Sequence, residues 1–204
     1  MTAIFVVLCN ALIIYLFKKN DNELCEKMNN TYIYRMYVFS FVAGLIIGNM
    51  PEPLNNLLVI PTVVVFVAAE TDMMMQQIYS VTCIVCLITG IGLILSYNYG
   101  FKNYLIRVVA CGLLLLIFRG LKALNTGDIE LIFSLTPYFY IVSMEYSRPT
   151  FIESFLFLMA GACVFSLVMN FKKYIKDRIT SFPFAVPTCV CYCSYFFLLN
   201  VIYG

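Results

Sequence analysis

Eight long apolar segments dominate the sequence and constrain the fold more than any other feature. They span residues 2–17, 33–49, 55–71, 77–97, 104–118, 129–144, 150–170 and 184–203. Their residues do not alternate between apolar and polar, as the strands of a membrane β-barrel would. Helices satisfy their own backbone hydrogen bonds inside lipid, so continuous apolar segments predict membrane helices. Several segments are shorter than the ~20 residues that a perpendicular span needs. We therefore expect an all-α fold, a polytopic membrane helical bundle of about eight transmembrane helices (six to eight), in a single integral-membrane domain over residues 1–204.

The composition agrees with a membrane protein surrounded by lipid. Hydrophobic residues make up 62% of the chain and charged residues only 12%, about half of what a soluble domain carries. The net charge is +2 and the basic residues are scattered, so no nucleic acid partner is expected. No basic region precedes the first segment and no small-residue cleavage site follows it. We therefore expect a retained first span and not a cleaved signal peptide.

The basic residues predict how the chain is oriented in the membrane. The loops after the first, fifth and seventh segments hold nine of them: Lys18, Lys19, Lys27, Arg119, Lys122, Lys172, Lys173, Lys176 and Arg178. The alternate loops hold two, Lys102 and Arg148, and Arg35 and Arg107 lie near the ends of spans. Because basic loops stay in the cytosol, both termini are expected outside. The loops after the third and fifth segments then share the cytosolic face.

The absence of histidine narrows the available chemistry. It excludes Ser-His and Cys-His catalytic pairs and the zinc sites that use histidine ligands. Most of the nine cysteines lie inside apolar segments, such as Cys83 and Cys86, without a second pair to complete a four-ligand site. Such cysteines pack as small hydrophobic residues. We expect no metal and no cofactor.

Two aspartates lie at the ends of apolar segments on the predicted cytosolic face. Each alone can be a helix N-cap, Asp128 after Gly127 and Asp72 before a helix starting near Met73. As a pair they allow other chemistry. Carboxylates held close together share one proton, so the ionised one can activate water while the protonated one polarises a scissile carbonyl. Aspartyl proteolysis of this kind needs no histidine, metal or cofactor, and it is compatible with capping.

Three short motifs accompany the two aspartates. They are DMMMQQIYS at residues 72–80, NTGDIEL at 125–131 and PFAVP at 183–187. In this order they resemble the type IV prepilin peptidase family, which are GxGD-type membrane aspartyl proteases. That family has an Asp about six residues before an Ile-Pro-Asn-like triplet, then Gly-x-Gly-Asp-x-Lys-Leu, and then Pro-Phe-x-x-Pro at the start of the last span. The resemblance covers the chain from about residue 50 onward.

The resemblance implies an aspartic endopeptidase in the cytoplasmic membrane, with Asp72 and Asp128 as catalytic residues on the cytosolic side. It implies that the motifs support the site through Gly127, Glu130, Ile78, Pro183, Phe184 and Pro187. The implied substrate is a prepilin or pseudopilin, including the Tad type, from which a short basic leader is removed. Longer members carry a methylating cytosolic domain after the first span. Here that loop is only KKNDNELCEKMNNTY, so we expect a peptidase-only form.

The departures from the family pattern concern substrate preference more than the reaction. Asn125 replaces the first Gly of the second motif, and Asn tolerates a left-handed backbone better than most residues. Glu130 replaces the usual Lys, while Tyr79 and Ser80 replace Pro and Asn.

Several interpretations stay open at the level of sequence. Glu70 and Glu130 can attract a basic leader, or they can be solvated acids at helix ends. Pro183 and Pro187 are expected to set the start of the last span, where proline costs no hydrogen bond. Two other functions compete with the peptidase. One is a catalytically degenerate relative that acts in pilus or secretion assembly, and the other is a proton-coupled transporter, which predicts acids near the bilayer midplane.

Overall fold

The computed structural model describes residues 1–27, 30–121, 124–146, 148–177 and 184–203, and these residues form helices without any strand. In chain order the helices are α1 (Thr2–Asn20), α2 (Asn22–Lys27), α3 (Asn30–Gly48), α4 (Leu54–Leu57), α5 (Val59–Met75), α6 (Ser80–Ser96), α7 (Phe101–Gly120), α8 (Thr126–Glu145), α9 (Phe151–Asp177) and α10 (Ala185–Tyr203). The all-α prediction is therefore confirmed. Apart from the short α2 and α4, each helix corresponds to one apolar segment of the sequence.

Five of these helical segments are long and apolar enough to cross a membrane. They are Thr2–Asn20, Leu54–Met75, Phe101–Gly120, Phe151–Asn170 and Ala185–Tyr203. Two further apolar helices, Ile33–Gly48 and Ser80–Ser96, are shorter. The remaining long helix, α8, mixes acidic, hydroxyl and proline residues into its apolar sequence. Membrane character is thus supported, while a count of eight spans and their sidedness stay predictions.

Large apolar side chains cover much of the outer surface of the bundle. Exposed examples on the outer helices are Ile4, Leu8 and Leu12 of α1, Ile84 and Ile88 of α6, Ile106 and Leu113 of α7, and Val164 and Leu167 of α9. Soluble monomers rarely expose large contiguous apolar patches. Such a surface suits contact with lipid tails.

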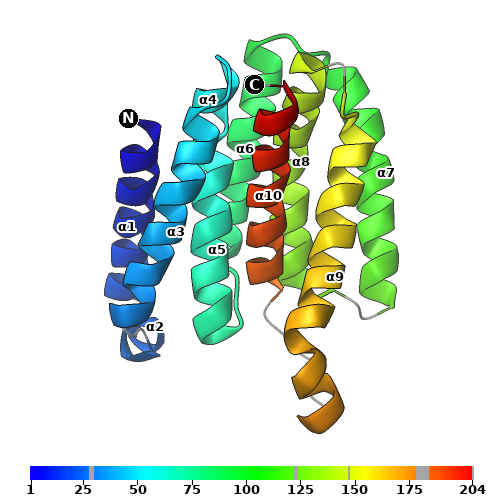
Figure 1. Cartoon of the computed structure of the whole chain (residues 1–204). Coiled ribbons are helices and arrows are strands. Elements are labelled where there is room, and N and C mark those ends of the chain that lie inside the picture. Colours follow the sequence, from blue (N-terminus) through cyan, green and yellow to red (C-terminus); the bar gives the residue numbers. More distant parts are fainter. Residues whose placement is uncertain (28–29, 122–123, 147, 178–183, 204) are drawn as a thin grey trace.

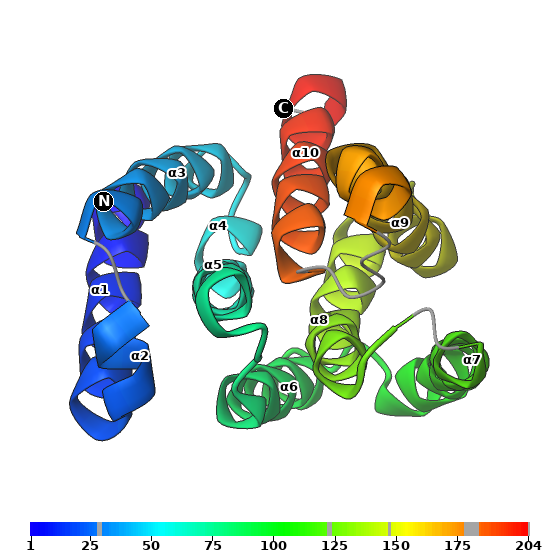
Figure 2. The ribbon, with the colours of Figure 1, turned by 90° about the horizontal axis from the view of Figure 1, so that it is seen from below.

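The centre of the bundle is formed by α5, α8 and α10. Seen along the bundle, α1 and α3 pair on one side of α5, while α6 and α7 flank α8, and α9 lies beside α10 (Figure 2). Residues 61–72 of α5 are all buried, as are residues 131–132 and 134–142 of α8. The two aspartate-bearing helices are therefore the innermost ones.

Successive long helices run in opposite directions, so helix ends from distant parts of the sequence meet. The end of α5 and the starts of α6, α8 and α10 lie at one end of the bundle, drawn at the bottom of Figure 1. The start of α1 and the end of α10 lie at the opposite end of the bundle (Figure 1). Which side of the membrane they face stays a prediction.

Close packing and polar contacts join the central helices. A Cβ on Gly90 of α6 would lie 2.7 Å from Cβ of Pro137, a residue inside α8, so only glycine fits there. Hydroxyl pairs link helices at Thr62–Tyr192, Thr89–Tyr138, Tyr104–Thr136 and Ser154–Tyr195, with oxygen separations of 3.1, 2.8, 3.1 and 2.6 Å. Inside a membrane such interhelical hydrogen bonds contribute about 0.6 kcal/mol each.

The cysteines of the apolar segments are mostly interior, as predicted. Cys83, Cys86, Cys111, Cys189 and Cys191 are buried. Among the described residues, no group of three or more His, Cys, Asp or Glu side chains is placed to hold a metal ion.

Candidate active site

Asp72 lies near the end of α5 and is only 5% exposed. The helix continues through Met75 and stops at Gln76, whose φ of 54° is left-handed and whose N–H donates to the carbonyl of Asp72 at 2.8 Å. The interpretation of Asp72 as the N-cap of a helix starting near Met73 is therefore wrong. The next helix, α6, starts only at Ser80.

The Asp72 carboxylate contacts the start of α10. The N–H of Ala185, the first residue of that helix, donates to Asp72 Oδ2 at 2.8 Å. The first N–H groups of a helix have no partner within it and carry partial positive charge, so a carboxylate there is favourable. An acid at the end of one helix thus caps the beginning of another.

This contact brings the described part of the third motif, residues 184–187, to the first aspartate. Phe184 is buried directly before α10, and Pro187 lies in the first turn of the helix. Proline fits there because the N–H it lacks would have no acceptor within the helix. Pro187 lies in the first turn of the last helix, as expected, while its role in setting the start of a span stays a prediction and Pro183 lies outside the described residues.

Asp128 lies in the first turn of α8 and is also 5% exposed. The N-cap is Asn125, whose side chain accepts from the N–H of Asp128, while Asp128 Oδ2 accepts from the N–H of Asn125 at 3.0 Å. This reciprocal arrangement is a capping box. Asn125 has φ −80° and ψ 167°, so the left-handed turn expected for it is absent and its side chain serves as a cap instead.

The two carboxylates share one pocket of about 310 Å³. It lies where α5 ends and α6 and α8 begin, and its lining consists of Asp72, Gln76, Gln77, Ile78, Ser80, Asn125, Thr126, Gly127, Asp128 and Glu130. The carboxylates of Asp72 and Asp128 interact electrostatically. The pocket is lined by polar side chains and is large enough to admit water beside the two carboxylates.

Gly127 and Ile78 connect the first and second motifs directly. A Cβ on Gly127 would lie 3.2 Å from Cβ of Ile78, a distance that leaves little room for a methyl group. Ile78 belongs to the segment between α5 and α6, and it also lines the pocket. The glycine before Asp128 therefore lets this segment pack against the start of α8.

The segment that carries Ile78 is fixed at its other side by Tyr79. The Tyr79 hydroxyl donates a hydrogen bond to Asp21 Oδ2. The centroid of the Tyr79 ring lies 4.3 Å from the centroid of the Phe17 ring. Asp21 Oδ1 in turn accepts from the N–H of Leu24 in α2. The sequence marked Tyr79 only as a departure from the family pattern and gave no sign of this partner.

The two glutamates near the motifs have different surroundings. Glu130 lines the pocket, and its Oε2 is buried without a hydrogen-bond partner. Glu70 is 0% exposed, does not line the pocket, and accepts a hydrogen bond from Asn10 of α1. The expectation that Glu70 faces a substrate leader, or is a solvated acid, is therefore wrong, because α5 turns it away from the pocket and into the bundle.

Pocket residues that sequence reasoning missed include Gln76, Gln77 and Thr126. Each lies within one of the first two motifs, at a position to which the family pattern gives no role. Ala185 contributes a hydrogen bond to Asp72 from its backbone N–H. Almost any residue type can provide this donor, so the sequence gives no indication of it.

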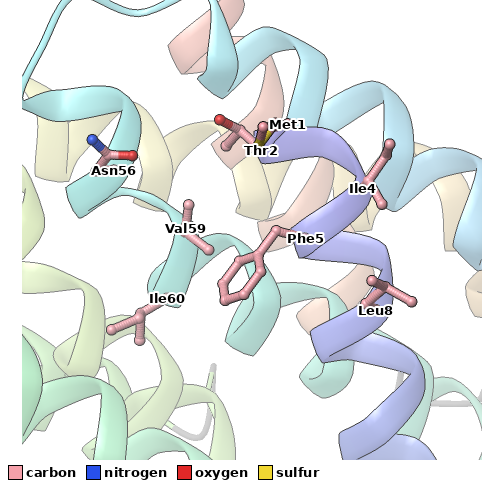
Figure 3. A pocket seen from close by; sticks show the side chains of 8 residues that line it. All are labelled: Met1, Thr2, Ile4, Phe5, Leu8, Asn56, Val59 and Ile60. Carbon is pink, nitrogen blue, oxygen red and sulfur yellow. The ribbon is translucent and has the colours of Figure 1, made fainter.

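A second, larger groove of about 610 Å³ lies at the opposite end of α5 (Figure 3). It is formed by the start of α1 and by α4 and α5, with Ile4, Phe5, Leu8 and Ile60 among its lining residues. Its lining side chains include no carboxylate and no base. It has the character of a lipid-facing groove and not of a reactive site.

The chain matches no protein-family model, no curated protein and no solved structure. A functional assignment therefore depends on the residues and the geometry of the molecule itself. The feature best suited to catalysis is the pair of buried aspartates that line one pocket at the end of the bundle.

Proposed function

We propose that this protein is a membrane aspartic endopeptidase whose catalytic pair is Asp72 and Asp128. The observation that carries the proposal is that both side chains, from different central helices, line one pocket and interact electrostatically. Neither aspartate has a basic partner among the residues that line this pocket. Two buried acids without a counter-charge are costly for a structure, and such pairs are characteristic of active sites.

In the proposed reaction the two carboxyl groups hold one proton between them, because neighbouring carboxylates cannot both ionise easily. The ionised carboxylate accepts a proton from water as the water oxygen attacks the peptide carbon. The protonated carboxyl donates a hydrogen bond to the carbonyl oxygen. When the C–N bond breaks, a carboxyl group returns a proton to the leaving amine. The sum is hydrolysis without metal or cofactor.

The backbone contacts of the two aspartates support positioning. The N–H of Ala185 orients Asp72, and the N–H of Asn125 orients Asp128. An ionised carboxyl has about four acceptor sites, so each group keeps capacity for water or substrate after these contacts. Groups held in advance on helix termini contribute to rate because little reorganisation accompanies the reaction.

The proposed substrate is a prepilin or pseudopilin with a short basic leader and an apolar helix. The site lies at one end of the bundle, where the charge distribution of the sequence predicts the cytosolic face of an eight-span protein in the cytoplasmic membrane. The substrate helix would lie in the membrane, with the bond after its leader entering the pocket in an extended form. Without a cytosolic domain after α1, removal of the leader is the only expected step, with no methylation.

The position of the acids favours this function over a proton-coupled transporter. Transport predicts acids near the bilayer midplane. Asp72 lies in the last turns of α5, and Asp128 lies in the first turn of α8.

The proposal is tested by co-expressing the protein with candidate prepilins from the same genome. We expect leader removal by the wild-type protein and none by Asp72→Asn or Asp128→Asn, at equal amounts of membrane-inserted protein. Retained cleavage in either variant would contradict the dyad. No cleavage by any form, together with restored pilus assembly by all of them, would instead identify a non-catalytic assembly factor.

A further inference from the structure

Outside the candidate active site, one polar pair is buried between α1 and α5. Asn10 Nδ2 donates a hydrogen bond to Glu70 Oε1 at 2.9 Å, and both residues are 0% exposed. Their surroundings are apolar: Val6 and Ile14 of α1 and Val63 and Val67 of α5 belong to the same buried cluster. A glutamate in such a place needs a physical explanation, since buried acids are costly unless they are paired.

The pair leaves two polar atoms without partners. Glu70 Oε2 and Asn10 Oδ1 are both buried and accept no hydrogen bond. Both atoms are acceptors, and an ionised Glu70 has no donor to offer, so Glu70 Oε2 and Asn10 Oδ1 cannot bond to each other in that state. A protonated carboxyl has one O–H donor, and a single proton on Oε2 of Glu70 can be donated to Oδ1 of Asn10. Both atoms are then satisfied by one additional hydrogen bond.

The groups that face Glu70 from the other helices provide no positive charge. Its electrostatic partners among the described residues are Tyr37 of α3 and Cys189 of α10, together with the amide of Asn10. None of these side chains carries a positive charge. An ionised Glu70 would therefore be a buried charge without a counter-ion, which is the arrangement that proteins avoid.

We propose that Glu70 is protonated at neutral pH and forms, with Asn10, a neutral acid–amide lock that joins α1 to α5. The lock consists of two antiparallel hydrogen bonds in one ring, from amide to acid and from acid to amide. Glu70 is a positioning residue here, not a catalytic one. An ion-coupling role, by contrast, would require this carboxyl to gain and lose its proton.

The lock has a consequence for the candidate active site. Residues two positions apart on a helix point about 200° apart, because each residue turns the helix by about 100°. Glu70 therefore fixes one side of α5 to α1, while Asp72 on the other side is held by Ala185 of α10. Together the two contacts set the rotation of α5 and the direction of Asp72. This consequence for catalysis depends on the proposed peptidase function, whereas the protonated pair does not.

Glu70→Gln and Glu70→Ala form a matched pair of variants. Glutamine reproduces the protonated acid: its Oε1 accepts from Asn10 Nδ2 and its Nε2 donates to Asn10 Oδ1. Alanine leaves the amide of Asn10 unsatisfied. We expect Glu70→Gln to unfold at the wild-type temperature in lipid nanodiscs and Glu70→Ala to unfold at a lower one. Equal destabilisation of both variants would overturn the proposal.

A spectroscopic measurement tests the proton directly, in the full chain and without any use of cleavage. Infrared spectra are recorded at neutral pH on Asp72→Asn/Asp128→Asn protein, so that the dyad adds no protonated carboxyl. We expect a protonated-carboxyl C=O band that disappears when Glu70→Gln is added and that persists in a Glu130→Gln control. Absence of the band, or its persistence in Glu70→Gln, would overturn the proposal even if Glu70→Ala does not fold. Neither result depends on whether the protein is a peptidase.

Discussion

The backbone N–H of Ala185 donates a hydrogen bond to the carboxylate of Asp72 across 2.8 Å. The contact joins the end of α5 to the start of α10, two elements far apart in the sequence. It explains how an acid near a helix C-terminus, where the dipole of its own helix is unfavourable, is stabilised by the dipole of another helix. It also places Phe184 and the first turn of α10 against the candidate active site.

Ala185→Pro tests this contact. Proline removes the N–H donor yet suits the first position of a helix. A hydrogen bond to a charged group contributes about 1.5–3 kcal/mol, so we expect cleavage to fall by about 10- to 100-fold. Initial cleavage rates of purified variants measure the effect. Ala185→Gly, which keeps the N–H, is the control and should retain most of the activity. Equal loss in both variants would indicate that packing at Ala185 matters and the hydrogen bond does not.

Gly127→Ala tests the contact between the first two motifs. The added Cβ would meet Ile78 at 3.2 Å and push the segment after α5 away from the start of α8. Small displacements of catalytic groups can cost up to ~100-fold in rate, and we expect a loss of about tenfold or more. Adding Ile78→Ala makes room and should recover part of the rate.

The matched control for Gly127→Ala is Gly92→Ala on α6. No atom lies within 4 Å of a Cβ built on Gly92, so this substitution should leave cleavage unchanged. No loss in Gly127→Ala, or no recovery in the double variant, would contradict the packing argument.

Tyr79→Phe tests the hydrogen bond that joins the segment between α5 and α6 to Asp21, which lies between α1 and α2. Burial and the hydrogen bond to Asp21 raise the pKa of the Tyr79 hydroxyl above its usual value of about 10, so the donor is present at neutral pH. Since the raised pKa keeps a proton in the folded state that the unfolded state loses, this contribution to stability is lost only as the pH rises above about 10.

We expect Tyr79→Phe and Asp21→Asn each to lower the free energy of unfolding. We also expect the double variant to show a coupling of about 0.5–3 kcal/mol, as residues in contact do. Denaturant unfolding in detergent measures all four corners of this cycle. Additive effects would show that the hydroxyl and the carboxylate do not depend on each other.

Glu130→Gln tests whether the pocket selects basic leaders. Glu130 lines the pocket beside Asp128, with one buried oxygen lacking a hydrogen-bond partner. If it attracts a basic leader, the variant should lose about 1 kcal/mol of preference for basic over neutral leaders, as expected for a partly exposed ion pair. Competition between two prepilin peptides of different leader charge measures the preference. An unchanged ratio would show that Glu130 does not take part in selection.

Much of the fold follows from the sequence because apolar length is a local property. The last apolar segment was expected over residues 184–203, and α10 spans Ala185–Tyr203. The position of Asp72 was misjudged for a local reason as well. An aspartate before three methionines resembles the N-cap of a new helix, but the three methionines are the last residues of α5. The contact that stabilises Asp72 at this helix end comes from the N–H of Ala185 in α10 and is not visible in the local sequence.

The candidate site was predictable as residue types but not as contacts. Asp72, Asp128, Ile78 and Gly127 were singled out from motifs, and the structure brings them together. The burial of Glu70 was missed because its partner, Asn10, lies 60 residues away in the sequence. Tertiary partners of this kind leave no periodic or compositional trace in the segments that carry them.

The most direct test of the Asp72–Asp128 dyad is the cleavage rate of the purified full chain in lipid nanodiscs. The substrate is a synthetic peptide with a basic leader followed by an apolar helix, and the products are identified by mass spectrometry. We predict one cut at the end of the leader by the wild-type protein. We predict that the cleavage rate falls by about 10³-fold or more in Asp72→Asn and, separately, in Asp128→Asn. When two groups act as one catalytic unit, removal of either costs about as much rate as removal of both. Cleavage by either variant at the wild-type rate would show that Asp72 and Asp128 do not form the catalytic pair.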